Sequence, residues 1–245
     1  MSTLIAPPSK RRRFFYAEDY LPESDGRPLA ETERHRDLMI GLLHALKERF
    51  RKNERIYVTG NIFVYYRDEN GELQPVSPDI FVVRGVAKKE RRIYKIEDEG
   101  KAPEVVIELI SRATTVEDYV TKRHIYALLG VKEYFIFDPY REAQPSALAG
   151  FRLERGEYVP MTVARHNGSL HLRSKVLGLE LRVEKGLLRL YDPKTGERLR
   201  TPEEAEEDRR TAEQRATAAE AKAAAAEAEA ARLRKQLAKL QRRKP

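Results

Sequence analysis

The sequence predicts a mixed α/β domain whose elements follow the order αβββαβ, with a helical tail after it. Segments of helical and of strand periodicity alternate between about residues 32 and 138. Two strand segments, 79–84 and 104–110, are apolar on both pleat faces, which is typical of central strands in a sheet covered on both sides. From residue 201, Ala, Glu, Arg, Lys and Gln dominate and Gly is absent. We therefore predict an α/β sandwich with a mixed central sheet and a separate tail.

The helices of the domain are expected over residues 32–52 and 115–130. The second has capping-box spacing at its start and a glycine at its end. Together with strands 104–110 and 133–138 it has the length of a right-handed βαβ crossover, so these two strands should be parallel. The remaining strands are expected over residues 56–66, 79–84, 150–155 and 158–163.

The net charge of +8 is distributed unevenly. Residues 1–13 are expected to form a disordered basic arm with a charge of +4. The domain, residues 14–200, has 32 basic and 30 acidic side chains, and the tail, residues 201–245, has 11 and 9. This charge is compatible with DNA binding, although a solvated terminus is the simpler explanation of the arm. The chain has no cysteine and no apolar run of signal-peptide or membrane-spanning length, so we expect a cytoplasmic protein without a membrane segment.

Residues 201–245 fit a heptad repeat. With Leu237 at position a and Leu240 at position d, alanine or leucine occupies the earlier a and d positions back to Ala205. Only Arg209 interrupts this apolar seam, which predicts a coiled coil and therefore self-association of the chain. The alternative is a single alanine-rich helix without a partner.

Glu108 interrupts an otherwise apolar central strand, between Val106 and Ile110 on the same pleat face. An ionised carboxylate is too costly to bury alone, so we expect a metal ion, a cationic partner or a raised pKa for Glu108. A single buried salt bridge is the structural alternative. Asp79 opens the preceding strand, where an ordinary strand start is the alternative explanation. If the two strands are neighbours, both carboxylates come within reach of one ion.

The two helices supply further polar groups. Residues three and four apart share a helical face, so Asp118, Lys122 and Tyr126 fall together in the apolar stripe of the second helix. Lys122 supplies a cation, unless its stem packs while its ammonium reaches water. At the start of the first helix, Glu31 and His35 share a face. Glu31 is a candidate metal ligand or a partner of the helix dipole, and His35 is a candidate supporting or phosphate-facing group.

These residues favour metal-assisted hydrolysis. Asp79, Glu108 and the backbone carbonyl of Leu109 would form an oxygen-rich site suited to Mg²⁺ or Mn²⁺. The ion would polarise a phosphoryl oxygen and lower the pKa of a bound water, while Lys122 would orient that water or offset charge on phosphorus. A basic segment offers candidate nucleic-acid contacts, with a solvated hairpin as the alternative. Its members are Lys88, Lys89, Arg91, Arg92 and Lys95.

Several segments together form a recognisable set. They are Ser77-Pro78-Asp79-Ile-Phe-Val-Val, Val106-Ile-Glu108-Leu-Ile-Ser111, Thr114 and Thr115, Asp118, Lys122, Tyr126, Gly130-Val-Lys-Glu-Tyr134 and Asp138-Pro139. The set resembles the Uma-two family of restriction-endonuclease-like proteins in the PD-(D/E)XK superfamily, and the resemblance covers about residues 30–190. Ala-Glu31-Thr-Glu-Arg-His35 and the alanine-rich tail resemble one branch of that family.

The resemblance implies a restriction-endonuclease-like fold, with Asp79 as the Asp and Glu108 as the (D/E) of the motif. The lysine of the motif would fall on Ile110, which cannot serve, and Lys122 is the natural substitute. We therefore expect a Mg²⁺-dependent DNA endonuclease with Asp79 and Glu108 as ligands, Lys122 as the catalytic cation and Glu31 assisting. The alternatives are a catalytically inactive module that binds nucleic acid or protein, and a structural assembly protein held together by the tail.

Overall fold

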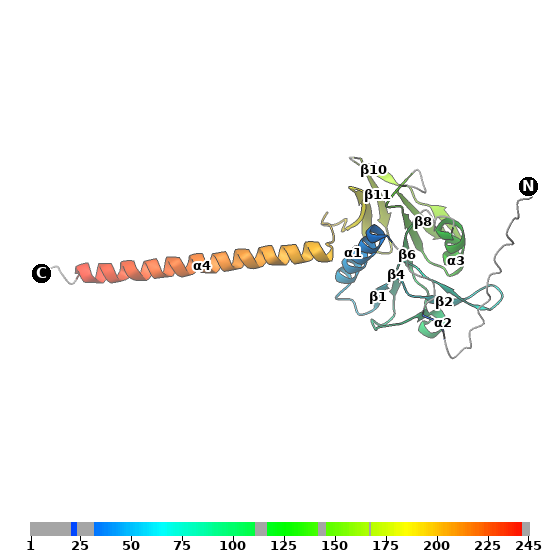
Figure 1. Ribbon diagram of the computed structural model, residues 1–245, viewed down its shortest axis with the longest axis horizontal. Helices are drawn as coiled ribbons and strands as arrows, with labels where there is room; N and C mark the ends of the chain where they lie inside the picture. The colour runs from blue at the N-terminus through cyan, green and yellow to red at the C-terminus, as the bar shows by residue number, and fades with distance from the viewer. Residues whose placement is uncertain (1–20, 24–31, 111–116, 142–145, 167, 242–245) are drawn as a thin grey trace, which may run out of the picture.

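A six-stranded sheet forms the centre of the protein, whose computed structural model describes residues 21–23, 32–110, 117–141, 146–166 and 168–241 (Figure 1). The strands, in spatial order, are β1 (Ile56–Thr59), β4 (Ile80–Arg84), β6 (Val105–Leu109), β7 (Glu133–Phe137), β8 (Leu148–Glu154) and β9 (Glu157–Pro160). β6 and β7 are parallel, and the other neighbouring pairs are antiparallel. The predicted mixed sheet and the predicted parallel pair are therefore confirmed.

Two smaller sheets and the helices complete the described fold. One sheet has the order β3-β2-β5, with β2 (Val64–Arg67), β3 (Leu73–Val76) and β5 (Tyr94–Lys95). The other runs β10 (Ala164–His166), β11 (Ser169–Ser174), β12 (Leu179–Glu184) and β13 (Leu187–Tyr191). The helices are α1 (Glu33–Arg49), α2 (Ile96–Glu99), the π-helix η1 (Glu117–Lys122), α3 (Arg123–Leu128) and α4 (Pro202–Gln241).

The central sheet is covered on both faces, as its apolar strands predict. α1 and the β11, β12 and β13 strands pack on one face, where Leu46 and Ile107 are fully buried. α3 and strand β2 cover the other face, with Tyr126 and Tyr134 in the core. A fully buried leucine or isoleucine contributes about 2 kcal/mol to folding, so this double cover fixes β4, β6 and β7 firmly. Polar side chains on these strands are therefore held in fixed positions.

The single strand predicted over residues 56–66 is wrong, because it is two strands in different sheets. The chain turns at Gly60 and Asn61, where Asn61 has a φ of 54° and its N–H donates to the carbonyl of Pro78 at 2.9 Å. A Cβ at Gly60 would lie 1.8 Å from the carbonyl oxygen of Asp79, so only glycine fits this crossing. The turn therefore presses directly on the backbone of a candidate site residue.

The helix predicted over residues 115–130 is π-helical over Glu117–Lys122 and α-helical over Arg123–Leu128. Its expected start at Thr115 lies outside the described residues. The glycine cap is confirmed, because Gly130 has a φ of 75° and the next N–H, of Val131, donates to Tyr126 at 2.9 Å.

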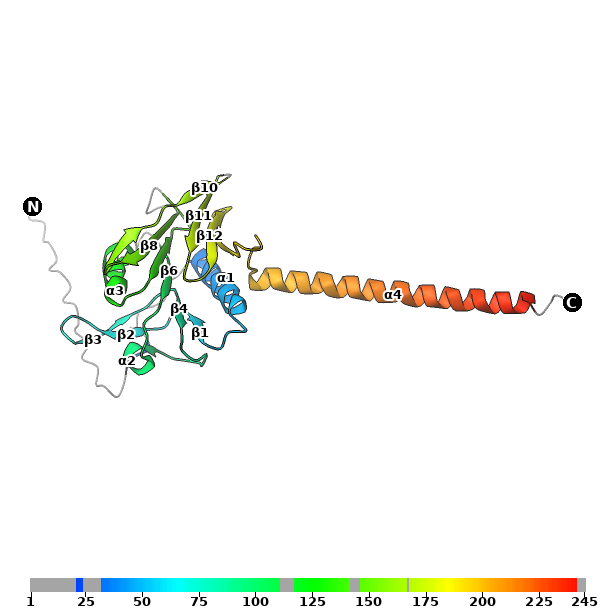
Figure 2. The same ribbon diagram turned by 180° about the vertical axis from the view of Figure 1, so that it is seen from behind.

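α4 is a long helix that leaves the domain and points away from it (Figures 1 and 2). The predicted helical tail is therefore confirmed, whereas a coiled-coil partner stays a prediction. Its root approaches α1 closely, since a Cβ at Gly41 would lie 3.3 Å from Cγ2 of Thr201. In the described part of the chain, no helix combines the length and the apolar character needed to cross a membrane.

Candidate active site

Strands β4 and β6 bring Asp79 and Glu108 together. Ile80 stands opposite Ile107 in this antiparallel pair, so Asp79 stands opposite Glu108. The N–H of Asp79 donates to Oε2 of Glu108 at 3.2 Å, and the N–H of Leu109 donates to Oδ2 of Asp79 at 2.7 Å. The two carboxylates that the sequence singled out therefore lie side by side at one end of the central strands.

Glu108 is fully buried among polar groups. Its Oε1 accepts the hydroxyl of Tyr126 at 2.6 Å and lies 3.1 Å from Nζ of Lys122. Burial raises the pKa of Glu108 well above its ordinary value; Lys122 opposes this shift, while Asp79 and Asp118 add to it. The carboxylate of Glu108 therefore needs more positive charge around it than the protein supplies.

Lys122 lies between two carboxylates. Its Nζ is 3.1 Å from Glu108 and 2.9 Å from Oδ1 of Asp118, and its side chain is 14% exposed. The ammonium therefore points into the cluster, in contrast to the snorkelling alternative. Burial would lower the pKa of Lys122, but the charges of Glu108, Asp118 and Asp79 raise it above its ordinary value. The π-helical turn of η1, a distortion often found at functional sites, carries both Asp118 and Lys122.

Asp79 also faces the first turn of α1. Nε2 of His35 lies 3.6 Å from Oδ1 of Asp79. The N-cap residue Thr32 accepts the N–H of His35 at 3.3 Å, which holds this turn in place. Burial would raise the pKa of Asp79, but the contact with His35 and the charge of Lys122 hold it below its ordinary value. Asp79 is therefore the more readily ionised of the two carboxylates.

Two further residues were predicted as metal ligands, Leu109 and Glu31. Leu109 contributes its backbone N–H to Asp79, and a role for its carbonyl stays a prediction. Glu31 lies outside the described residues.

The basic segment that was predicted to contact nucleic acid lies away from this site. Nζ of Lys88 donates to the carbonyl of Phe50 at 2.8 Å, at the end of α1 that is about 22 Å from His35. The guanidinium of Arg91, whose side chain is 4% exposed, pairs with Glu99 at 2.8 Å. Lys88 and Arg91 are therefore occupied with holding the fold together. Phosphate binding by this segment stays a prediction, and Lys89 and Arg92 are its more exposed members.

One contributor to the site was missed by sequence reasoning. The hydroxyl of Tyr134, on β7, donates to the backbone carbonyl of Asp118 at 2.9 Å and so ties η1 to the central sheet. A tyrosine in a buried strand needs a partner for its hydroxyl, and that need was the available signal.

The acidic cluster is a candidate metal site by the chemistry of its side chains. Within the described residues, no three His, Cys, Asp or Glu side chains are arranged to hold a metal. The cluster does contain three carboxylates, of Asp79, Glu108 and Asp118, against the single ammonium of Lys122. Carboxylate oxygens are the donors that Mg²⁺ and Mn²⁺ prefer, and the excess of negative charge attracts a cation. The chemistry of these donors therefore suits a hard divalent ion, which Asp79 and Glu108 would hold, although the described side chains do not already form a set of three ligands.

The fold and this cluster define a mixed α/β protein with an acidic site at the ends of its central strands. The profile of the Uma2 family, described as "Putative restriction endonuclease", matches residues 16–184, and the chain belongs to that family. The resemblance noted in the sequence is thereby confirmed. The crystal structure of "a putative nuclease belonging to DUF820" from Anabaena variabilis ATCC 29413 is similar at 14% identity and a TM-score of 0.43, over 60% of this chain and 84% of that one. No match was found among curated proteins.

Proposed function

We propose that the protein is a DNA endonuclease that hydrolyses phosphodiester bonds with Mg²⁺ or Mn²⁺. Membership of a family of restriction-endonuclease type supports the reaction class. The observation that carries the proposal is the fully buried Glu108, which lies against the backbone of Asp79 and 3.1 Å from Lys122. When bound by Asp79 and Glu108, the ion would polarise a phosphoryl oxygen and lower the pKa of a water ligand.

Lys122 acts in this proposal as a positive charge. A lysine whose pKa is raised keeps its proton at neutral pH, so Lys122 is unsuited to act as a general base. Its ammonium offsets negative charge that develops on the phosphoryl group.

The neighbouring polar groups hold these side chains in position. Tyr126 donates to Glu108 at 2.6 Å, which fixes the carboxylate on the side of the sheet that α3 covers. Asp118 holds the ammonium of Lys122 at 2.9 Å, and His35 holds Asp79. Tyr126, Asp118 and His35 are therefore assigned as positioning residues.

The test is nicking of supercoiled plasmid by the purified full chain with Mg²⁺ or Mn²⁺. The wild type should nick the plasmid and Glu108→Gln should not. Glu104→Gln is the matched control, because Glu104 lies just before the same strand and pairs with Arg84 and Lys132 outside the site. Nicking by Glu108→Gln at the wild-type rate would reject the assignment.

A second candidate function is a nuclease-like module that binds nucleic acid or protein without cutting it. It is favoured by one observation: the position expected for the lysine of the family motif holds Ile110, which is fully buried in an apolar cluster. Metal-independent binding of DNA by the wild type, with no nicking in either metal, would support this module over the enzyme.

We also infer that the chain self-associates through residues 201–245. α4 is exposed along nearly all of its described length, and Leu233, in its predicted seam, is 51% exposed. Deletion of residues 201–245 should lower the particle mass measured by light scattering, and an unchanged mass would contradict self-association through the tail. A cytoplasmic location is part of the proposal, because a chain without cysteine suits a reducing compartment.

A further inference from the structure

α4 carries its charges in a pattern that a solitary helix does not need. In the heptad frame that places Leu233 at d, the charged residues from 215 to 234 flank the seam, apart from Arg232. They are Arg215, Lys222 and Glu229 at g, and Glu220, Glu227 and Arg234 at e. A helix that stabilises itself places opposite charges three or four residues apart, but here those neighbours are apolar or threonine, except that Glu229 has Arg232 three residues later. In the described part of α4, ion pairs form only nearer its root, so these six charges have no partner within their own helix.

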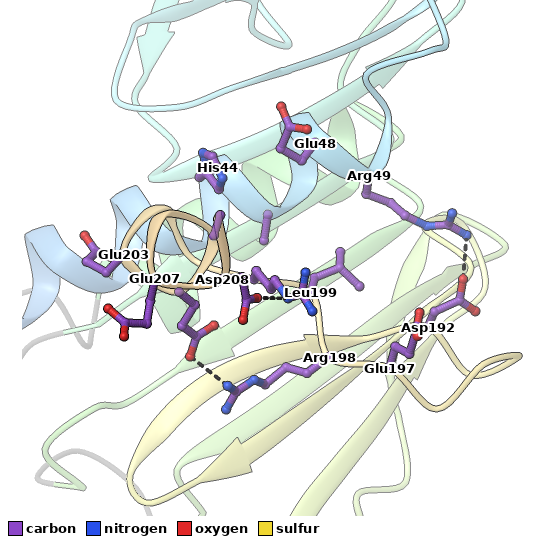
Figure 3. Close-up of a pocket in the computed structure, with 14 residues that line it drawn as sticks. His44, Glu48, Arg49, Asp192, Glu197, Arg198, Leu199, Glu203, Glu207 and Asp208 are labelled. Atoms are coloured by element: carbon purple, nitrogen blue, oxygen red, sulfur yellow. Dashed lines mark ion pairs between the residues drawn. The ribbon is translucent and has the colours of Figure 1, made fainter. Parts of the chain in front are cut away.

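The root of α4 shows the contrasting arrangement. Arg209 pairs with Glu206 at 2.9 Å and also with Glu213, and Asp208 pairs with Arg200 at 2.6 Å. Figure 3 shows this joint, where Asp208 and other charged side chains line a cavity of about 1100 Å³ between α1 and α4. None of the candidate site residues lines that cavity. The charged side chains at the root of α4 are therefore paired within the chain, whereas those from residue 215 to residue 234 are available to pair with another molecule.

We infer that α4 pairs with α4 of a second copy of this chain as a parallel, in-register, two-stranded coiled coil. This inference rests on the proposed self-association and adds its orientation. In a parallel pair, each g residue faces the e residue five positions later on the other helix. The facing pairs are then Arg215 with Glu220, Lys222 with Glu227, and Glu229 with Arg234. All three are attractive, and the two-fold axis repeats each of them.

One g–e pair in the described part of α4 would bring like charges together, that of Asp208 with Glu213. Both side chains already have cationic partners in their own chain, Arg200 for Asp208 and Arg209 for Glu213. The repulsion is therefore largely offset before the helices meet. Arg209, which interrupts the a positions of the seam, is held by the same network.

An antiparallel pair is disfavoured by the same residues, because e then faces e and g faces g. The e positions hold glutamate four times in succession before Arg234, at Glu206, Glu213, Glu220 and Glu227. With the two helices antiparallel over their full lengths, Glu220 and Lys222 would each face their own copies and Glu213 would face Glu227, while Glu206 would face Arg234 and Arg215 would face Glu229. Repulsive and attractive pairs are then about equal in number, whereas attractive pairs predominate in the parallel arrangement. Alanine knobs bury little area, so these charges decide the orientation.

The parallel arrangement places two domains at the same end of a rod about 60 Å long. The a and d positions before Leu233 hold mostly alanine, so the two helix backbones can approach each other closely.

Single cysteines test this orientation directly, since the chain has none of its own. Ala212→Cys and Ala226→Cys lie at d, and Ala221→Cys at f is the control of the same chemistry. In a parallel pair, oxidation should form a disulfide between the two chains of each d variant and none between the two chains of the f variant. In an antiparallel pair, the two copies of residue 212, and likewise those of residue 226, would lie more than about 10 Å apart along the coiled coil. This distance is too large for a disulfide. Light scattering that gives a dimer mass, with no link at either d position, would overturn the parallel arrangement.

Charge reversal gives an independent test. The variant with Arg215→Glu and Lys222→Glu, and the variant with Glu220→Lys and Glu227→Lys, should each self-associate about tenfold more weakly than the wild type. Mixing the two should restore wild-type affinity, because each of the altered g–e pairs, 215 with 220 and 222 with 227, is again attractive. No restoration on mixing would contradict the proposed pairs. Plasmid nicking by the wild type is measured separately, so a failure of the nuclease proposal and a failure of the dimer proposal give different results.

Discussion

Two buried glutamates on neighbouring strands of the central sheet have opposite surroundings. Glu133, the first residue of β7, is 1% exposed and Glu108, near the end of β6, is fully buried. Glu133 accepts the hydroxyl of Ser174 and the N–H groups of Lys175 and Val176, the latter two at 2.9 and 3.3 Å. These donors clamp the β11–β12 turn to the sheet.

Glu108, in contrast, lies among other acids. Asp79 and Asp118 both act to raise its pKa, and Lys122 is shared between Glu108 and Asp118. The comparison teaches that burial alone does not make a carboxylate functional. Glu133, with neutral donors and the guanidinium of Arg152 at 3.7 Å around it, holds the structure together, whereas Glu108 shares its cation with a second acid and so has negative charge to offer to a metal ion.

The largest expected effect is the loss of activity when Glu108 is substituted. This substitution is also the strongest test of the contrast with Glu133. Glu108→Gln should lower metal-dependent nicking by about 1000-fold, because the amide cannot replace an anionic ligand. The variant should stay folded, since the substitution removes a charge that burial disfavours and leaves Lys122 paired with Asp118, which offsets the poorer contact of an amide with the N–H of Asp79. Urea denaturation followed by circular dichroism checks the second part. A variant that unfolds would give Glu108 the structural role assigned here to Glu133.

The same substitution at Glu133 should act on stability. Glu133→Gln should lower the free energy of unfolding by about 3 kcal/mol, because an amide group would meet the hydroxyl and N–H donors that the carboxylate now accepts. Its nicking rate per folded molecule should match the wild type. Loss of nicking in a folded Glu133→Gln protein would contradict the contrast between the two sites.

Substitution of Lys122 should lower both the activity and the stability of the protein. Lys122→Met should slow nicking by about 100-fold. It should also destabilise the domain, because the carboxylates of Glu108 and Asp118 lose their shared cation. Lys122→Arg should recover part of both losses. If Lys122→Met destabilised the domain but nicked at the wild-type rate per folded molecule, Lys122 would have a structural role alone.

The smallest expected effect concerns a third acid, outside the site. The hydrogen bond from Arg91 is the main reason why the pKa of Glu99 falls from 4.5 to about 2. A pKa that is lower in the folded state stabilises the fold above pH 4.5, and this contribution is lost as the pH falls toward 2. Thermal melts between pH 5 and pH 3 should therefore show a loss of stability that is about 1 kcal/mol larger in the wild type than in Glu99→Gln. Equal pH dependence of the two proteins would count against the Arg91 pair.

Part of this fold could be predicted because its signals are local. The apolar runs of β4 and β6, the crossover length between β6 and β7, and the glycine at 130 each lie within a short segment. Glu108 was found because it interrupts one such run, and the register of β4 on β6 then brings Asp79 to it.

The rest depends on partners that lie far away in the chain. β1 and β2 read as one strand, because their assignment to different sheets is decided by the packing of Gly60 on Asp79. In sequence, Glu133 is as much an acid in an apolar strand as Glu108 is. Its different role follows from Ser174, which is 41 residues farther along the chain and gives no local signal.

The direction of the tail depends on a space about the size of one methyl group. Because a side chain at position 41 would press on Thr201 at 3.3 Å, Gly41 lets α4 begin flush against α1. A bulkier residue there would tilt the whole rod, and over a length of about 60 Å a tilt of a few degrees displaces the far end by several ångströms. The direction of α4 is thus set where it meets α1, by the absence of a side chain at Gly41.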